Sequence, residues 1–261
     1  MKKIVLFVAF FAATFFIANS ANAQTAPLHL YSNNNNAWLM YFGDHKISDK
    51  WGIHLEAQMR RANWGNTWQQ LLLRTGVNYH FNNQVFGTVG YCYVETYPYG
   101  DFPVKAAFPE NRIWEQIQIK TPINNVEWVS RFRLEQRFSN VPVLNTADGT
   151  YAPGASVYTN RFRLLNRFSI PFQGKSIVDK SLYLSAYDEL MVNFGENVGA
   201  NFFDQNRAYL ALGYKIPKVG RLEVGYMMQN IFKSDGIKIE NNGTLQVGIS
   251  SNIDFYKKVA Q

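Results

Sequence analysis

The chain has one cysteine, Cys92, and four histidines among its 261 residues. A single cysteine excludes an intramolecular disulfide and a CxxC redox or metal site. No cluster of His, Asp and Glu shows the spacing of metal ligands, so we expect no metal and no other cofactor. Beyond Ala18, no apolar run approaches the roughly 20 residues that a transmembrane helix needs. These absences exclude enzymes with a CxxC redox or metal site, and they exclude proteins that cross the membrane with helices in the region beyond Ala18.

The first residues have the pattern of a secretory signal peptide. Lys2-Lys3 forms a positive n-region, and an apolar run from Ile4 to Ala18 follows it. Ala21-Asn22-Ala23 then supplies the small residues that signal peptidase accepts. An uncleaved membrane anchor is the alternative, but the run is short for a span. We therefore expect a signal peptide at 1–23, cleaved near Ala23, and an exported domain at 24–261.

The net charge and the aromatic content indicate which class of exported protein this is. The formal net charge is +7, a balance that often indicates nucleic-acid binding, but export argues against a nucleic-acid partner. Aromatic residues make up 16% of the chain, although the mean hydropathy is slightly negative. An exported, aromatic-rich chain of moderate hydropathy is typical of a transmembrane β-barrel, because its lipid-facing and lumen-facing residues average out.

Apolar and polar residues alternate with a period of two through almost the whole mature region. In residues 51–60, Ile53, Leu55 and Met59 fall on one face, opposite His54, Glu56 and Arg60. Such alternation without intervening helices predicts antiparallel strands joined as a meander, as in an up-and-down barrel. About eleven segments show the pattern: 37–46, 51–60, 70–81, 84–97, 112–121, 126–138, 158–168, 181–193, 203–216, 220–232 and 244–255.

The connections between these segments alternate in length. Short turns at 47–50, 82–83, 122–125 and 217–220, and an intermediate one at 172–180, alternate with longer loops at 61–67, 98–110, 139–156, 195–201 and 233–243. Bacterial outer-membrane barrels have this arrangement, with short periplasmic turns and usually an even number of strands. We therefore expect an all-β, antiparallel barrel of twelve strands, with ten as the alternative. A missed strand or residues 28–31 would supply the twelfth, unless residues 24–36 thread the lumen.

Arginine concentrates on the polar side of the predicted strands. A charge facing lipid at the midplane costs about 2–4 kcal/mol, so this side must face the barrel interior. Either cross-lumen Arg–Glu pairs fill a small barrel, or unpaired arginines make an anion-favouring lumen or pore. Inward-folded loops could add the acids Asp101, Glu110 or Asp148. The set, which we call the charge ladder, comprises Arg60, Arg74, Arg131, Arg133, Arg137, Arg161, Arg163, Arg167, Arg207, Arg221, Glu56, Glu135, Glu189 and Glu223.

The few histidines of the mature region include two candidates for a catalytic base. Outer-membrane lipases and lipid A hydrolases use a serine nucleophile with a histidine base, and His54 beside Glu56, or His80, would be the candidates. Nothing in the sequence pairs either histidine with a particular serine, and a histidine hydrogen-bonded in a polar lumen is the simpler interpretation. We therefore predict a non-enzymatic barrel, structural or pore-forming, without catalytic residues. The alternatives are a lipid- or glycan-modifying enzyme and a soluble lipocalin-like barrel.

Aromatic residues cluster near the ends of the predicted strands. We interpret them as the girdles that anchor a barrel at the two membrane interfaces. A terminal aromatic, within Ile253–Tyr256, is common in barrels recognised by the outer-membrane insertion machinery. The girdle set is Trp51, Trp64, Trp68, Tyr97, Tyr99, Trp114, Phe168, Phe172 and Phe255.

Several motifs occur in an order that resembles a known family, the outer-membrane barrels grouped as domain of unknown function 2490. They are residues 38–44 with Trp51, the segment 131–138 with the related 161–163, and then 187–190, 204–207 and 225–227. The resemblance implies a barrel in the outer membrane of a Gram-negative bacterium and no assigned activity. The expected partners are outer-membrane lipid, the insertion machinery and periplasmic chaperones. The oligomeric state is left open.

Overall fold

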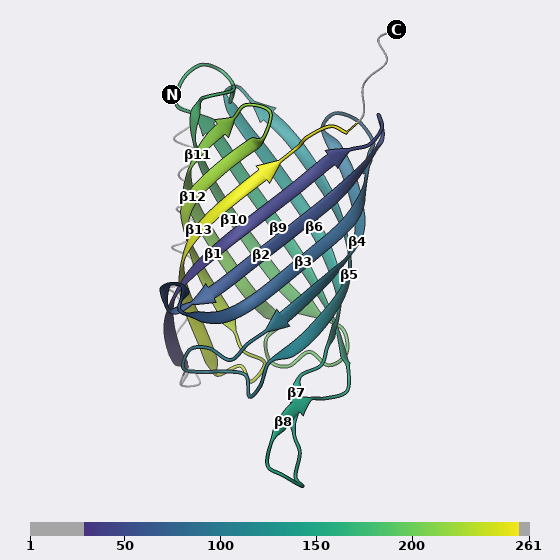
Figure 1. The fold of residues 1–261 in the computed structure, drawn as a ribbon, viewed down its shortest axis with the longest axis vertical. Helices are drawn as coiled ribbons and strands as arrows, with labels where there is room; N and C mark the ends of the chain where they lie inside the picture. The colour runs from purple at the N-terminus through teal and green to yellow at the C-terminus, as the bar shows by residue number, and fades with distance from the viewer. Residues whose placement is uncertain (1–28, 256–261) are drawn as a thin grey trace, which may run out of the picture.

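The computed structural model describes residues 29–255, which form one closed β-barrel and a separate two-stranded hairpin (Figure 1). No helix within these residues is long and apolar enough to cross a membrane. The barrel strands are β1 (Leu30–Lys46), β2 (Trp51–Ala62), β3 (Thr67–His80), β4 (Val85–Thr96), β5 (Phe108–Ile123), β6 (Val126–Ser139), β9 (Val157–Pro171), β10 (Leu182–Phe194), β11 (Phe203–Ile216), β12 (Gly220–Phe232) and β13 (Lys238–Ser251). The hairpin consists of β7 (Pro142–Leu144) and β8 (Tyr151–Pro153).

The barrel closes with eleven strands rather than the expected twelve or the alternative of ten. All neighbouring strands pair antiparallel except β1 and β13, which pair in parallel, with Asn36 opposite Thr244. An odd number forces this arrangement, because the last strand then runs in the same direction as the first. The eleven predicted segments correspond to the eleven strands, although β1 and β13 begin earlier than predicted, and the assumption of an even number was wrong. Residues 30–36 extend β1 and neither form a separate strand nor thread the lumen, whereas residues 24–28 and the predicted signal peptide lie outside the described residues.

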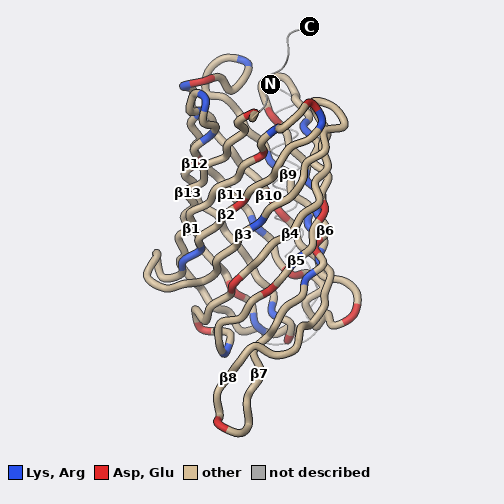
Figure 2. Tube along the Cα trace, turned by 45° about the vertical axis from the view of Figure 1, so that its right-hand side comes forward, with Lys and Arg blue, Asp and Glu red and all other residues tan. Residues whose placement is uncertain are grey.

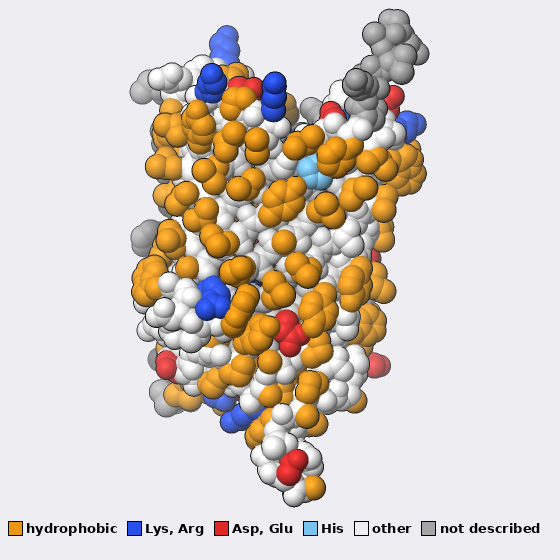
Figure 3. Space-filling model, viewed as in Figure 1, with side chains coloured by type: hydrophobic (Ala, Val, Ile, Leu, Met, Phe, Trp, Pro, Cys, Tyr) orange, Lys and Arg blue, Asp and Glu red, His pale blue; other side chains and the backbone are white. Residues whose placement is uncertain are grey.

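The barrel buries its polar side and exposes its apolar side. Leu39, Leu73 and Val89 point outward and are 55%, 47% and 63% exposed, whereas the inward-pointing Arg133 and Glu135 are 1% and 0% exposed. In Figure 3 hydrophobic side chains cover the visible wall of the barrel, with few charged groups among them. The period-two alternation of the sequence therefore separates two faces, as predicted, and the charged face is the inner one.

The two ends of the barrel differ in their connections. One end, the turn end, carries the short connections β1–β2, β3–β4 and β5–β6, and β13 finishes there. The other end, the loop end, carries the longer β4–β5 and β6–β9 connections, and the β7–β8 hairpin projects beyond it (Figures 1 and 2). Two predicted long loops are shorter than expected, because only residues 63–66 connect β2 and β3 and only residues 233–237 connect β12 and β13.

Candidate functional site: the barrel lumen

The centre of the lumen contains a carboxylate shared by four arginines. Glu135 on β6 is fully buried, and its oxygens lie 2.8 Å from Arg161, 2.9 Å from Arg163, 3.1 Å from Arg74 and 3.4 Å from Arg112. The planar guanidinium group suits this place because it keeps its charge and donates several hydrogen bonds in one plane. Glu135 thus links β3, β5, β6 and β9 across the lumen.

A second shared carboxylate lies nearer the turn end. Glu189 on β10 accepts from Arg131 at 2.7 Å and Arg163 at 2.8 Å, and Arg207 lies 3.6 Å away. Because Arg163 contacts both Glu135 and Glu189, the two clusters form one network. Arg–Glu pairs therefore fill the lumen as predicted, and two of the pairs in these clusters, Arg74 with Glu135 and Arg131 with Glu189, connect strands that are not neighbours in the sheet.

Buried polar side chains also fill the loop end. Glu110 accepts from Arg137 at 2.7 Å and also pairs with Arg112, while Arg161 donates to Asp204 at 2.8 Å. The β4–β5 loop folds inward and adds two further hydrogen bonds at this end. Tyr99 donates to the fully buried Glu240 at 2.7 Å, and Asp101 accepts from Ser32 at 2.9 Å. Burial beside the Glu240 carboxylate raises the pKa of the Tyr99 hydroxyl, which therefore remains a donor.

Two arginines of the charge ladder have no carboxylate partner among the described residues. Arg133 bonds instead to Gln116 Oε1 at 2.8 Å, and its guanidinium lies 4.7 Å from the centre of the Trp114 ring. Arg60 bonds to Gln58 at 2.6 Å and lies 4.2 Å from the Trp38 ring. Aromatic stacking and amide oxygens stabilise these guanidinium groups without neutralising them, so both keep a full positive charge in the lumen.

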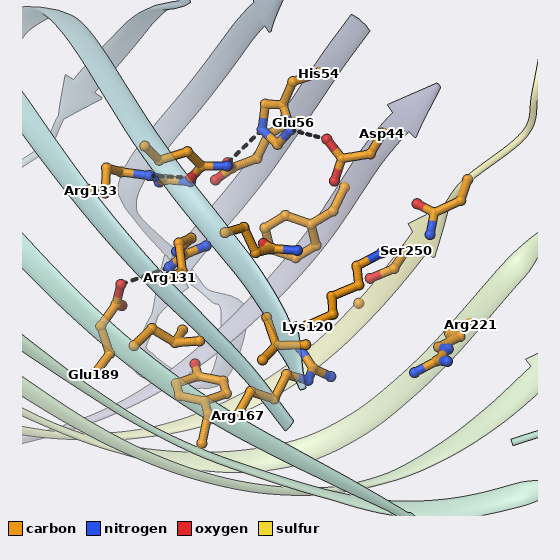
Figure 4. A pocket seen from close by; sticks show the side chains of 18 of the residues that line it. Asp44, His54, Glu56, Lys120, Arg131, Arg133, Arg167, Glu189, Arg221 and Ser250 are labelled. Atoms are coloured by element: carbon orange, nitrogen blue, oxygen red, sulfur yellow. Dashed lines mark hydrogen bonds and ion pairs between the residues drawn. The ribbon is translucent and has the colours of Figure 1, made fainter. Parts of the chain in front are cut away.

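A cavity of about 610 Å³ occupies the turn half of the lumen (Figure 4). Asn83 and Pro122, which lie at the turn end, are among the residues that line it. We call it the turn-side cavity. Arg60 and Arg133 line it together with Lys46 and Lys120, and none of these four cations has an ion pair within residues 29–255. Nearer the turn end, Glu223 pairs with Arg167, and Glu127 lies 2.7 Å from Arg221, spanning from β6 to β12. Of the other lining acids, Asp44 already accepts from His54 and Asn78, whereas Asp254 accepts no hydrogen bond from a side chain within residues 29–255.

His54 also lines the turn-side cavity, but carboxylates flank both of its ring nitrogens. Nδ1 lies 2.8 Å from Asp44 and Nε2 lies 3.4 Å from Glu56 (Figure 4). Two acceptors favour the doubly protonated ring, which cannot take up a further proton as a base would. His80 lies farther toward the turn end, against the Phe86 ring at 5.2 Å. Within residues 29–255 no hydrogen bond joins either histidine to a serine hydroxyl.

The structure brings all the members of the charge ladder into the lumen, but sequence reasoning missed several of their partners. Arg112 alternates with Trp114 and Gln116, a signal that could have placed it inside, whereas Glu110 was assigned to a loop and is the third residue of β5. Asp148, considered as an inward-folding acid, lies instead in the exposed tip of the β7–β8 hairpin. Trp114 is also corrected, because it is fully buried in the lumen rather than part of an aromatic girdle.

Trp114 reaches across the inner wall because two neighbouring strands carry glycine. In the register of the sheet, Trp114 lies opposite Gly90, Gly90 opposite Gly76, and Gly76 opposite His54. The indole ring ends 5.3 Å from the His54 ring, in an edge-to-face arrangement. A Cβ atom at Gly76 would lie 3.1 Å from Trp114 and 2.9 Å from the Val89 carbonyl oxygen. These glycines therefore make the space for the ring that Arg133 stacks upon.

No group of three or more His, Cys, Asp or Glu within the described residues could hold a metal ion. The fold and the lumen define a closed β-barrel with a charged interior and an apolar outer face. A comparison with protein families matches residues 35–240 to the family described as a protein of unknown function, DUF2490, and the chain belongs to that family. No curated protein and no solved structure matches the chain.

Proposed function

We propose that this chain is an outer-membrane β-barrel of a Gram-negative bacterium whose lumen is an anion-favouring chamber, closed at the loop end. The observation that carries the proposal is the inverted distribution of polarity, with charged residues buried inside and large apolar residues exposed outside. Water would make that outer face unstable, whereas lipid solvates it. A soluble lipocalin-like barrel needs the opposite arrangement, with an apolar interior and a polar outer face.

The short and long connections support an orientation with the turn end in the periplasm. In that orientation the turn-side cavity opens toward the periplasm, and the Glu135 and Glu189 network separates it from the loop end. A through pore would need a continuous water path, which the buried ion pairs and the inward β4–β5 loop block. The unpaired Lys46, Lys120, Arg60 and Arg133 raise the local concentration of anions in the chamber.

The lipid- or glycan-modifying enzyme gains no support from the site. Its candidate base His54 is flanked by Asp44 and Glu56, and no described serine hydroxyl bonds to it. Incubation of outer-membrane lipids with purified wild-type protein and with His54→Ala tests the enzyme hypothesis, and we expect identical lipid profiles. A change in the lipids that depends on His54 would restore the enzyme hypothesis.

Cell fractionation tests the proposed location. We expect the protein in the outer-membrane fraction, soluble only with detergent, and running as a faster band on gels when unheated than when boiled. Recovery in a detergent-free soluble fraction, with a single band position regardless of heating, would overturn the membrane proposal.

Planar bilayers test the closed chamber. Wild-type protein should give no steady conductance above background. A triple variant that removes three side chains of the network, Arg74→Ala, Glu135→Ala and Arg163→Ala, should conduct with anion preference. The matched control is Arg61→Ala, because Arg61 stacks outside on Trp68, 4.5 Å from its ring centre. The unheated gel band shows whether each variant has folded before it is measured. Steady wild-type conductance would refute the closure.

A further inference from the structure

The outer face of the barrel is not uniformly apolar. A row of polar side chains crosses it obliquely on four adjacent strands: Ser130 on β6, Asn166 on β9, Asp188 on β10 and Asn206 on β11. Ser130 lies opposite Asn166 in the register, Asn166 lies opposite Asp188, and Asn206 lies two residues beyond the partner of Asp188. We call this row the polar stripe.

The members of the polar stripe point away from the lumen. Their sequence neighbours Arg131, Leu165, Glu189 and Arg207 line the turn-side cavity, so the alternating residues face outward. Asp188 lies at the middle of β10, which runs from Leu182 to Phe194. At about 3.3 Å per residue and a strand tilt near 45°, Asp188 is roughly 14 Å from either end of β10 when the distance is measured along the barrel axis. If the barrel spans a membrane, as proposed above, Asp188 lies near the midplane.

On several strands outside the polar stripe the central outward residues are apolar, whereas the central outward residue of β5, Glu115, is a carboxylate to which Gln136 donates at 3.1 Å. Central outward positions on β1, β2, β12 and β13 are Leu39, Leu55, Val224 and Leu245, which are 55%, 42%, 46% and 40% exposed. A surface that meets only lipid gains nothing from polar residues, and these positions conform to that expectation. The polar stripe, together with the Glu115–Gln136 pair beside it, therefore gives the outer face of β5, β6, β9, β10 and β11 a polarity near mid-depth that the central positions of β1, β2, β12 and β13 lack.

The hydrogen bonds within the stripe are incomplete. Asn166 Oδ1 accepts from Ser130 Oγ at 2.8 Å and from Trp128 Nε1 at 3.1 Å, but its amide nitrogen has no acceptor among the described residues. Asp188 Oδ2 accepts from Asn206 at 3.0 Å, and Oδ1 receives no donor there. Acyl chains offer neither donors nor acceptors, so each unpaired group is costly in the bilayer core.

We propose that the polar stripe is the contact surface of a homodimer within the membrane. Asn166 carries the unused donor and Asp188, directly opposite it on the next strand, carries the unused acceptor. A two-fold axis close to this pair brings the Asn166 amide of each copy to the Asp188 carboxyl of the other. The Asn166–Asp188 contact is thus made twice, once from each copy, as a symmetric interface requires. The partner is therefore a second copy of this chain, because it carries both the donor and the acceptor that the polar stripe leaves unpaired.

Cysteine cross-linking in native membranes tests the interface. Leu190→Cys lies on the outer face of β10, two residues from Asp188, and Val224→Cys is the matched control on β12. The native Cys92 is fully buried and does not compete. We expect a bismaleimide to give at least about ten-fold more self-linked dimer with Leu190→Cys than with Val224→Cys. Equal yields from the two variants, or linkage of Leu190→Cys to a different protein, would overturn the proposal.

The double variant Asn166→Leu with Asp188→Leu tests the chemistry of the contact. Because each contact occurs twice, we expect the dissociation constant of the dimer, measured by analytical ultracentrifugation in detergent, to rise at least about ten-fold. Val224→Leu should leave it unchanged. An unaltered dissociation constant, or a monomeric wild-type protein, would refute the homodimer. Cell fractionation tests the outer-membrane location independently, so a wrong dimer interface can be distinguished from a wrong location.

Discussion

Replacement of Glu135 by glutamine tests whether the ion-pair network stabilises the barrel. The substitution preserves size and removes a fully buried negative charge that faces four guanidinium groups. Breaking a buried ion pair typically costs about 3–5 kcal/mol, because a charge is left without compensation.

The structure places the expected cost at the lower end of that range. Each of the four arginines keeps a second carboxylate: Arg74 keeps Glu56, Arg112 keeps Glu110, Arg161 keeps Asp204 and Arg163 keeps Glu189. We therefore expect a loss of about 3 kcal/mol in the free energy of unfolding. With a denaturant slope near 3 kcal/mol per molar in urea, the unfolding midpoint should fall by about 1 M.

Urea titration of the protein in lipid vesicles, followed by tryptophan fluorescence and by the unheated gel band, measures this shift. Glu196→Gln is the matched control, because Glu196 is exposed in the β10–β11 connection and has no ion pair among residues 29–255. We expect the control to change the free energy by less than about 1 kcal/mol. Equal midpoints for the two variants would refute a stabilising role for the network.

Two further predictions concern the wall and the loop end. Gly90→Ala should lower the free energy of unfolding by about 1–3 kcal/mol in the same urea titration, because a Cβ there lies 2.1 Å from the Thr75 carbonyl oxygen, whereas Gly87→Ala, with its nearest contact at 3.3 Å, should have little effect. In the β12–β13 loop, backbone N–H groups of Lys238 and Ile237 lower the pKa of Asp235 to about 2. The stabilisation from this depressed pKa is present above pH 3.8, the ordinary value, and is lost as the pH falls through about 2. A carboxyl NMR titration with its midpoint near 3.8 would contradict that account.

The sequence by itself determined which residues face inward. Alternation with a period of two needs only local backbone geometry, and the cost of a charge in lipid then assigns the arginine-bearing side to the interior. The strand segments and most of their boundaries could be predicted for the same reason. Glu110 was missed because it follows a long loop without a clear boundary signal, and Trp114 was misassigned because position near a strand end was given more weight than phase.

Only the tertiary structure decided how the barrel closes and what the inner charges contact. The parallel pairing of β1 with β13 joins residues that are about 200 positions apart, such as Asn36 and Thr244, and no local pattern encodes it. The same holds for Glu135, whose four arginine partners come from three other strands. Side-chain periodicity fixes the face on which a residue lies, whereas register and curvature fix its neighbours across the lumen. Register and curvature therefore determine which arginines pair with carboxylates in the network and which remain unpaired in the turn-side cavity.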